Sequence, residues 1–126
     1  MAREFKRADR VADFIKRELS VLIQREMRDP RVSGANINEV KVTADMSQAK
    51  VYVTFLGLET ADESKEAVEA LEKASGFLRS QLASVATMRS VPRLKFFFDE
   101  VARSSEYISE LIDKAVSTDS NDSSER

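Results

Sequence analysis

The side chains that could do acid–base chemistry in this sequence are carboxylates that stand close together along the chain. They occur as three groups: Glu59 with Asp62 and Glu63, Asp99 with Glu100, and Glu106 with Glu110. A catalytic carboxylate needs surroundings that shift its pKa, and all three groups lie in polar stretches. We therefore interpret them as solvated surface charges. A hydrolase that uses one of these pairs is the interpretation we disfavour.

The residue types missing from the chain exclude most other catalytic and metal chemistry. The chain has no His and no Cys, so it lacks the usual general base, a thiolate nucleophile and the commonest zinc ligands. Ser47, Ser75 and Ser80 have no imidazole to activate them. The three glycines are spaced too widely for a phosphate-binding loop. We predict a protein without enzymatic activity, metal or cofactor.

The remaining groups with a clear chemistry are cations, which bind phosphate. The chain of 126 residues carries 20 Lys and Arg against 22 Asp and Glu, but the charge is segregated. Residues 1–32 carry a net charge of +3, residues 33–76 carry −4, residues 77–98 carry +4 and residues 99–126 carry −5. A clustered basic surface attracts nucleic acid even when the average charge is negative.

Residues 4–28 are predicted to form a long amphipathic helix. Val11, Ile15 and Leu19 recur at the four-residue spacing of a buried helical stripe, and Pro30 ends the pattern. At about 100° per residue, five cations fall into one basic lane beside that stripe: Arg3, Lys6, Arg10, Arg17 and Arg28. A solvated helix face and a nucleic-acid-binding stripe both stay open as interpretations.

Alternating apolar residues predict three strands. Residues 37–44 and 49–56 alternate and are separated by a short polar connection, which predicts an antiparallel hairpin. Lys50, Tyr52 and Thr54 would lie on the face opposite to the buried residues. Residues 93–99 predict a third strand, in which Phe97 shares a face with Lys95. An exposed ring beside a lysine could stack on a base, but we favour a covering helix over Phe97.

A second helical pattern follows Thr60, which has the spacing of a capping box with Glu63. Its buried stripe includes Leu71 and continues through Phe77, Leu78, Leu82 and Val85. Gly76 lies in the middle, and glycine inside a helix costs about 1 kcal/mol relative to Ala. We therefore expect the helix to be kinked or split there.

Residues 104–116 predict a short last helix, with Ser104 as its N-cap and Ile112 among its buried residues. The polar residues 117–126 predict a disordered tail. The order of elements predicts one α+β domain over residues 1–116, with helices packed on one face of a three-stranded sheet. No apolar run approaches the ~18 residues of a membrane span, and no signal peptide follows the first residues. We expect a cytoplasmic protein that does not bind membranes.

Four segments of the sequence resemble the bacterial ribosome-binding factor A family. They are residues 7–12, 17–19 and 25–31 in and just after the first helix, residues 45–53 across the hairpin, residues 74–82 at the split helix, and residues 89–96 with Asp99 at the third strand. The resemblance implies a type II KH-like domain. In that family an Ala-x-Gly kink, here Ala74-Ser75-Gly76, replaces the usual GxxG nucleic-acid loop.

The resemblance also implies a function. The family binds free small ribosomal subunits, assists late maturation of small-subunit rRNA near its 5′ end, supports growth in the cold and has no catalytic activity. A ribosome-associated GTPase releases it in related systems. We expect a monomer whose partners are the small subunit and its rRNA. The residues expected to face RNA are Lys6, Arg7, Arg10, Arg17, Arg28, Arg31, Lys73, Ala74, Ser75, Gly76, Arg79, Arg89, Arg93 and Lys95.

A protein-interaction adaptor is the alternative. Its acidic surface, formed by Glu59, Asp62, Glu63 and Glu66, would dock a basic ribosomal protein or a GTPase.

Overall fold

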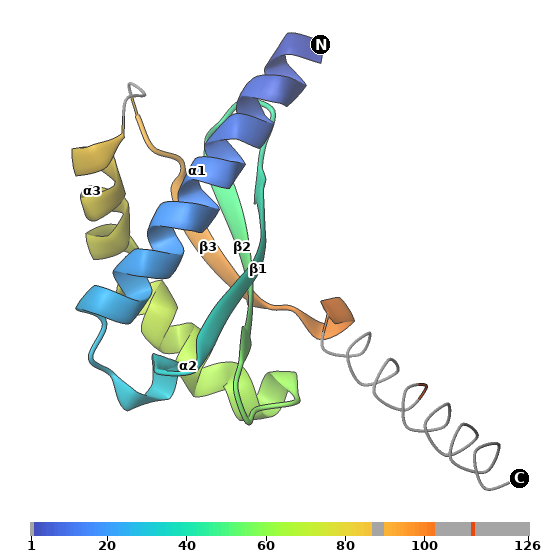
Figure 1. Ribbon diagram of the computed structural model, residues 1–126, viewed down its shortest axis with the longest axis vertical. Coiled ribbons are helices and arrows are strands. Elements are labelled where there is room, and N and C mark those ends of the chain that lie inside the picture. The colour runs from blue at the N-terminus through green and yellow to red at the C-terminus, as the bar shows by residue number, and fades with distance from the viewer. Residues whose placement is uncertain (1, 87–89, 103–111, 113–126) are drawn as a thin grey trace, which may run out of the picture.

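The helices and strands of the described part of the chain follow one another in the predicted order: a helix, two strands, a split helix and a third strand (Figure 1). The structure is a computed structural model that describes residues 2–86, 90–102 and 112, with side chains from residue 7 onward within these ranges. Its elements are α1 (Ala2–Glu26), the short 3-10 helix η1 (Pro30–Val32), β1 (Ala35–Val42), β2 (Gln48–Phe55), α2 (Ala61–Lys73), α3 (Ser75–Val85) and β3 (Arg93–Phe98).

The three strands form a mixed sheet in the order β1-β2-β3. The predicted hairpin is confirmed, because β1 and β2 pair antiparallel, with Val40 opposite Val51. The register shifts between Ile37 and Glu39, where Asn38 forms a bulge. The third strand, β3, runs parallel to β2. A parallel pair needs a long crossover connection, and α2 with α3 supplies it.

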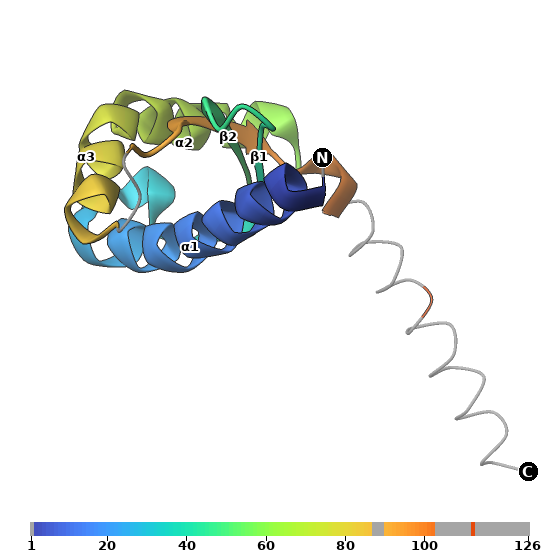
Figure 2. The ribbon, with the colours of Figure 1, turned by 90° about the horizontal axis from the view of Figure 1, so that it is seen from above.

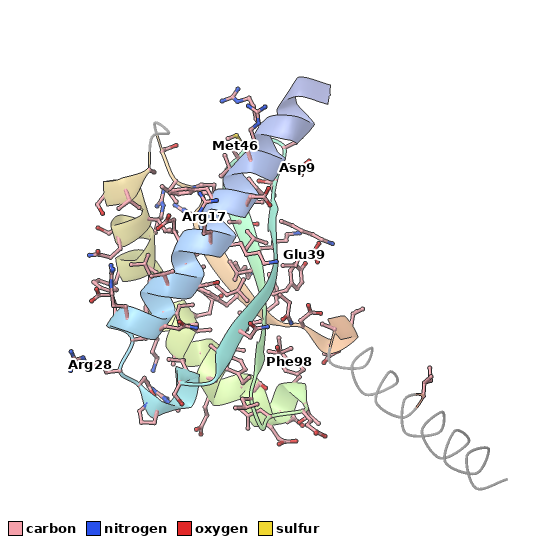
Figure 3. All side chains as sticks on the ribbon, viewed as in Figure 1. Asp9, Arg17, Arg28, Glu39, Met46 and Phe98 are labelled. Carbon is pink, nitrogen blue, oxygen red and sulfur yellow. The ribbon has the colours of Figure 1, made fainter. Side chains whose placement is uncertain are left out.

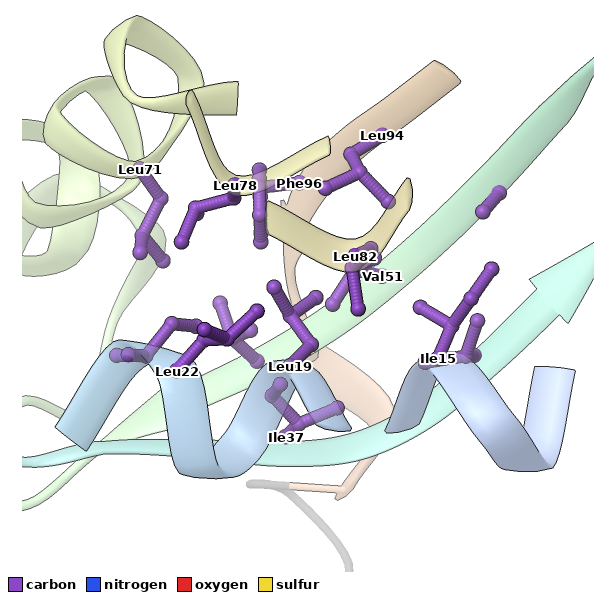
Figure 4. Close-up of a cluster of buried hydrophobic side chains, with 14 of the residues drawn as sticks. Ile15, Leu19, Leu22, Ile37, Val51, Leu71, Leu78, Leu82, Leu94 and Phe96 are labelled. Atoms are coloured by element: carbon purple, nitrogen blue, oxygen red, sulfur yellow. The ribbon is translucent and has the colours of Figure 1, made fainter. Parts of the chain in front are cut away.

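The hydrophobic core lies between the helices and one face of the sheet (Figure 4). Six side chains at its centre are fully buried: Ile15, Leu19, Val51, Val53, Leu78 and Leu82. The helices α1 and α3 contact each other, and α3 also contacts β3, an edge strand of the sheet (Figures 1 and 2). The predicted α+β class, with helices on one face of a three-stranded sheet, is confirmed.

The start of α2 and the presence of a split are as predicted, but the split lies two residues before Gly76. The hydroxyl of Thr60 accepts a hydrogen bond from the backbone N–H of Glu63 at 3.1 Å and donates one to the carboxylate of Glu63 at 3.2 Å. These two contacts form the expected cap of α2. The helix then breaks at Ala74, between Lys73 and Ser75.

Two expectations about the C-terminal part are wrong. Residues 100–102 are already helical, and Asp99 caps them, since its carboxylate accepts a hydrogen bond from the N–H of Ala102 at 3.0 Å. The cap therefore precedes Ser104. Ile112 was expected to be buried and is 56% exposed. The other residues of the predicted last helix and the tail 117–126 lie outside the described residues.

A carboxylate from α2 closes the outer edge of β3. An edge strand presents backbone N–H groups that no neighbouring strand can accept. The side chain of Glu72 accepts a hydrogen bond from the N–H of Phe96 in a partly buried position. This contact joins the end of α2 to the middle of β3 and leaves the Phe96 N–H paired.

Replacement of Glu72 should therefore destabilise the fold. Glu72→Ala leaves the Phe96 N–H unpaired, and we expect the free energy of unfolding to fall by about 1–3 kcal/mol. Glu72→Gln keeps an acceptor and should lose less. Glu69→Ala removes an exposed carboxylate from the same helix and should change stability by at most ~0.5 kcal/mol. Urea unfolding followed by circular dichroism measures all three, and a wild-type midpoint for Glu72→Ala would contradict the role of this contact.

Candidate nucleic-acid interface

The break between α2 and α3 leaves an open stretch of backbone at the start of α3. Ala74 ends α2 and begins α3, with φ −87° and ψ −1°, and no side chain caps α3. A Cβ built on Gly76 would meet no heavy atom within 4 Å, and the first turn of α3 has no acidic residue. The N-terminal end of a helix favours anions, so a phosphate could approach this turn without a steric or electrostatic barrier.

Exposed cations lie on the solvent side of α1. Arg7, Arg10 and Arg17 are exposed, and the Arg17 side chain retains 69% of its accessible surface. Arg17 is two residues from both Ile15 and Leu19, which places it about 160° around the helix from each. The basic lane therefore lies opposite the buried stripe, and the expectation that it lies beside the stripe is wrong. Lys6 is part of α1, but its side chain lies outside the described set.

Arg28 is not part of the helical lane. The helix α1 ends at Glu26, so Arg28 lies in the connection to η1 and extends from the end of the molecule where α1 ends (Figure 3). Asp29, which directly precedes Pro30, is extended, with φ −73° and ψ 122°, as the residue before a proline prefers, so the helix cannot continue through it. Arg28 is exposed but has a different position from Arg10 and Arg17.

Arg31 already has a partner within the protein. Its Nε donates to both carboxylate oxygens of Asp29, at 2.9 and 3.0 Å. The hydrogen bond from Arg31 lowers the pKa of Asp29 to about 2, and the same contact raises the pKa of Arg31. Glu66 and Glu69 of α2 favour the charged form of Arg31 as well. Arg31 therefore lies beside the acidic part of α2, away from the basic lane.

The remaining predicted cations divide between two sides of the molecule. Arg79, on α3, donates from Nε to the carbonyl of Val91 at 2.9 Å, and Lys73 is exposed at the end of α2. Arg93 and Lys95 alternate along β3 with the buried Leu94, so they lie on the sheet face turned away from the helices. Arg89 lies outside the described residues.

The structure therefore does not gather the predicted residues into one surface. The helix side holds Arg10, Arg17, Arg79 and the kink, whereas the open face of the sheet holds Arg93 and Lys95. Arg79 lies near the start of β3, because it bonds the carbonyl of Val91, two residues before Arg93.

The exposure of one aromatic side chain on the helix side differs from the sequence prediction. Phe77 was expected in the buried stripe and is 47% exposed. Leu78 is fully buried, and Phe77 lies about 100° around the helix from it. Val85, also expected in the stripe, is exposed at the last turn of α3. Phe77 directly follows Gly76, so an aromatic ring that can stack on a base lies next to the open backbone.

The acidic residues of the adaptor interpretation lie at the beginning of α2. Glu63 is engaged in the cap with Thr60. Glu66 and Arg31 line a shallow depression together with Leu56, which is 87% exposed. An exposed leucine beside acidic residues suits a protein partner better than RNA.

The described residues include no group of three or more His, Cys, Asp or Glu that could hold a metal ion. Within the same part of the chain, no helix has both the length and the apolar character needed to cross a membrane.

Comparisons with known proteins give a consistent result. A family model described as Ribosome-binding factor A matches residues 7–112. The ribosome-binding factor A of Saccharophagus degradans is 54% identical over 119 residues, which cover 94% of this chain and 93% of that protein. The crystal structure of ribosome-binding factor A from Thermus thermophilus matches with a TM-score of 0.62 and 31% identity, over 72% of this chain and 94% of that one.

A further match is a model of the Thermus thermophilus protein that was fitted into a cryo-EM map of a 30S complex. It has a TM-score of 0.56 and 33% identity, and the match covers 67% of this chain and 86% of that one.

Two glycine substitutions should have opposite effects on stability. Gly76→Ala meets no neighbour and improves helix propensity, so we expect the free energy of unfolding to rise by up to about 1 kcal/mol. Gly34→Ala would place a Cβ 3.0 Å from Cβ and 3.1 Å from the backbone N of Leu56, so stability should fall. Parallel urea titrations of both variants provide the check. Loss of stability in Gly76→Ala would mean that the fold itself requires glycine at the kink.

Proposed function

The chain belongs to the ribosome-binding factor A family, and from this membership we propose that it binds the free small ribosomal subunit and assists late maturation of its rRNA near the 5′ end. The observation that carries the proposal is the family match over residues 7–112. The relative that was fitted into a map of a 30S complex supports the choice of partner. We further propose that the protein acts in the cytoplasm as a monomer and supports growth in the cold.

A factor of this non-enzymatic family can act only through its binding free energy. It shifts the conformation of the subunit if it binds one conformation more tightly than another. We therefore propose that this protein binds an immature small subunit more tightly than the mature one. Its release follows when the subunit changes, and we propose a ribosome-associated GTPase as the partner in that step.

The helix side of the molecule is the proposed contact with rRNA. Arg10 and Arg17 project from α1 into solvent, and the kink exposes the backbone at Gly76. Contacts of cations and backbone N–H groups with phosphates fix the position of a protein but do not read sequence. Specificity then comes from the shape of the rRNA and from its unpaired strands.

Charge reversal in the basic lane should weaken binding. We expect Arg10→Glu with Arg17→Glu to lower the fraction of protein that co-sediments with small subunits, and to flatten the salt dependence, since fewer counterions are released. Sucrose gradients with separated small subunits, large subunits and whole ribosomes provide the measurement.

Arg10→Glu and Arg17→Glu are also measured one at a time. The control for these single variants is Lys65→Glu, which reverses one charge at an exposed position of α2. Unchanged affinity and salt dependence in the folded double variant would show that the lane is a solvated face. Loss of binding in Glu66→Gln, with the arginine variants intact, would favour the adaptor function.

A bulky side chain at the kink should weaken binding without weakening the fold. We expect Gly76→Leu to reduce co-sedimentation with small subunits because the side chain covers backbone that a phosphate approaches. Its thermal midpoint should stay at or above the wild-type value, since no heavy atom lies within 4 Å of the added Cβ. Gly76→Ala is the control for the loss of glycine alone. Wild-type affinity together with a lowered melting temperature would place the role of Gly76 in folding.

A further inference from the structure

The sheet face turned away from the helices carries cations in a regular arrangement. Lys41 of β1 pairs with Lys50 of β2, and Lys50 pairs with Lys95 of β3. The three lysines therefore form one row across all three strands. Arg93 lies opposite Gln48, two residues along β3 from this row. Only two of these cations, Arg93 and Lys95, were among the predicted RNA-facing residues.

This lysine row lowers the stability of the sheet. Like charges directly opposite each other on neighbouring strands repel. Among the described residues, the ion pair recorded for this row joins Lys41 Nζ to Glu39 Oε1 at 4.0 Å, and both side chains are more than half exposed. An exposed pair of this kind contributes little. An anion bound along the row would offset the repulsion.

The neighbouring row contains two stacked aromatic rings and, on β1, Glu39, which lies opposite Tyr52 and pairs with Lys41. Tyr52 lies opposite Phe97, and the ring centroids are 5.5 Å apart with an interplanar angle of 25°. Lys41 Nζ lies 5.6 Å from the Tyr52 ring and Lys95 Nζ lies 5.8 Å from the Phe97 ring. Both rings are partly exposed. The helices α1, α2 and α3 pack on the other face, so none of them is the cover that we expected over Phe97.

A hydrogen-bonded polar group bounds the aromatic row on its other side. Asn38 Nδ2 donates to the hydroxyl of Thr54 at 3.3 Å and to the carboxylate of Asp99 at 3.4 Å. Thr54 is buried, and Asp99 is engaged in its helical cap. These groups satisfy one another and place a negative charge at this end of the face. An anionic ligand therefore approaches from the lysine row.

We propose that this open sheet face, formed by Lys41, Lys50, Tyr52, Arg93, Lys95 and Phe97, binds a short unpaired RNA segment. Bases stack on the Tyr52–Phe97 pair, and the neighbouring phosphates lie along the lysine row. Adjacent rows on one face stand about 7 Å apart, the scale of one nucleotide. Sheets that present aromatic rings to unpaired bases are an established mode of RNA recognition.

The choice of RNA as the ligand rests on the proposed function, but the surface is separate from the helix side. An acidic peptide would satisfy the lysines and leave the stacked rings without a partner. Unpaired RNA satisfies both rows.

The test uses the full chain and a fluorescein-labelled decauridylate in an anisotropy titration, with the same strand paired to decaadenylate as the duplex probe. We expect tighter binding to the single strand. Phe97→Leu keeps an apolar side chain but removes the ring, and should weaken single-strand binding by about 5- to 150-fold, the equivalent of one lost base stack. Phe97→Tyr is the matched control, because it keeps an aromatic ring at the same position and should retain single-strand binding.

The lysine row has its own test. Lys50→Gln with Lys95→Gln should weaken binding and flatten its salt dependence, whereas Lys65→Gln on α2 should do neither. Lys95 is exposed and Lys50 is partly exposed on the open face, so the fold should survive, and circular dichroism verifies this for every variant.

Several outcomes would overturn the proposal. The wild-type protein would contradict it by binding the duplex and the single strand with equal affinity, or by failing to bind the single strand at all. Wild-type affinity of Phe97→Leu for the single strand would overturn the proposal as well. A concentration-dependent dimer in light scattering that Phe97→Leu abolishes would assign the face to a second copy of the chain. Co-sedimentation with small subunits is measured separately, so retention there with failure here rejects the sheet surface and leaves the proposed function intact.

Discussion

The structure depends on the burial of one face of β2, the central strand. Ala49, Val51 and Val53 are fully buried in the core beneath the helices. Strand side chains alternate between faces, and a slip of one residue would exchange the two faces. Burial of these three residues therefore sets the register of both neighbouring strands. It also forces Lys50 and Tyr52 onto the open face, so the packing of the core determines where the cations and rings lie.

The crossover between β2 and β3 extends this constraint to the helices. A parallel neighbour requires a long connection, and its helical residues must cover the apolar face of the sheet. The connection consists of two helices rather than one, and Glu72 at the end of the first joins β3 through the N–H of Phe96. The break at Ala74 separates these two helices. Leu71 of α2 and Leu78 of α3 both reach the core across it, so the kink is fixed from both sides while its backbone faces outward.

Features that depend on local spacing could be predicted from the sequence, and features that depend on tertiary placement could not. The hairpin and the Thr60 cap follow from alternation and from a capping motif. The low helix propensity of Gly76 indicates that the helix is split, but the break itself lies two residues earlier, at Ala74. The engagement of Arg31 with Asp29 and the exposure of Phe77 depend on where α1 ends and how α3 is rotated. The division of the cations into two surfaces requires the sheet to be placed relative to α1. A helical wheel contains none of this information.

Two features of the surface depart from the local rules for a stable fold. Gly76 weakens α3, although no neighbour excludes a side chain there, and Lys41, Lys50 and Lys95 repel one another across the sheet. Departures from local stability rules concentrate at functional sites, because elsewhere nothing offsets their cost. The first feature lies on α3 and the second on the open face of the sheet, and each exposes groups suited to phosphate. A protein with RNA contacts on both sides can hold two separate segments of rRNA at a fixed distance. A rigid spacer of this kind favours one arrangement of the subunit over another without catalysis.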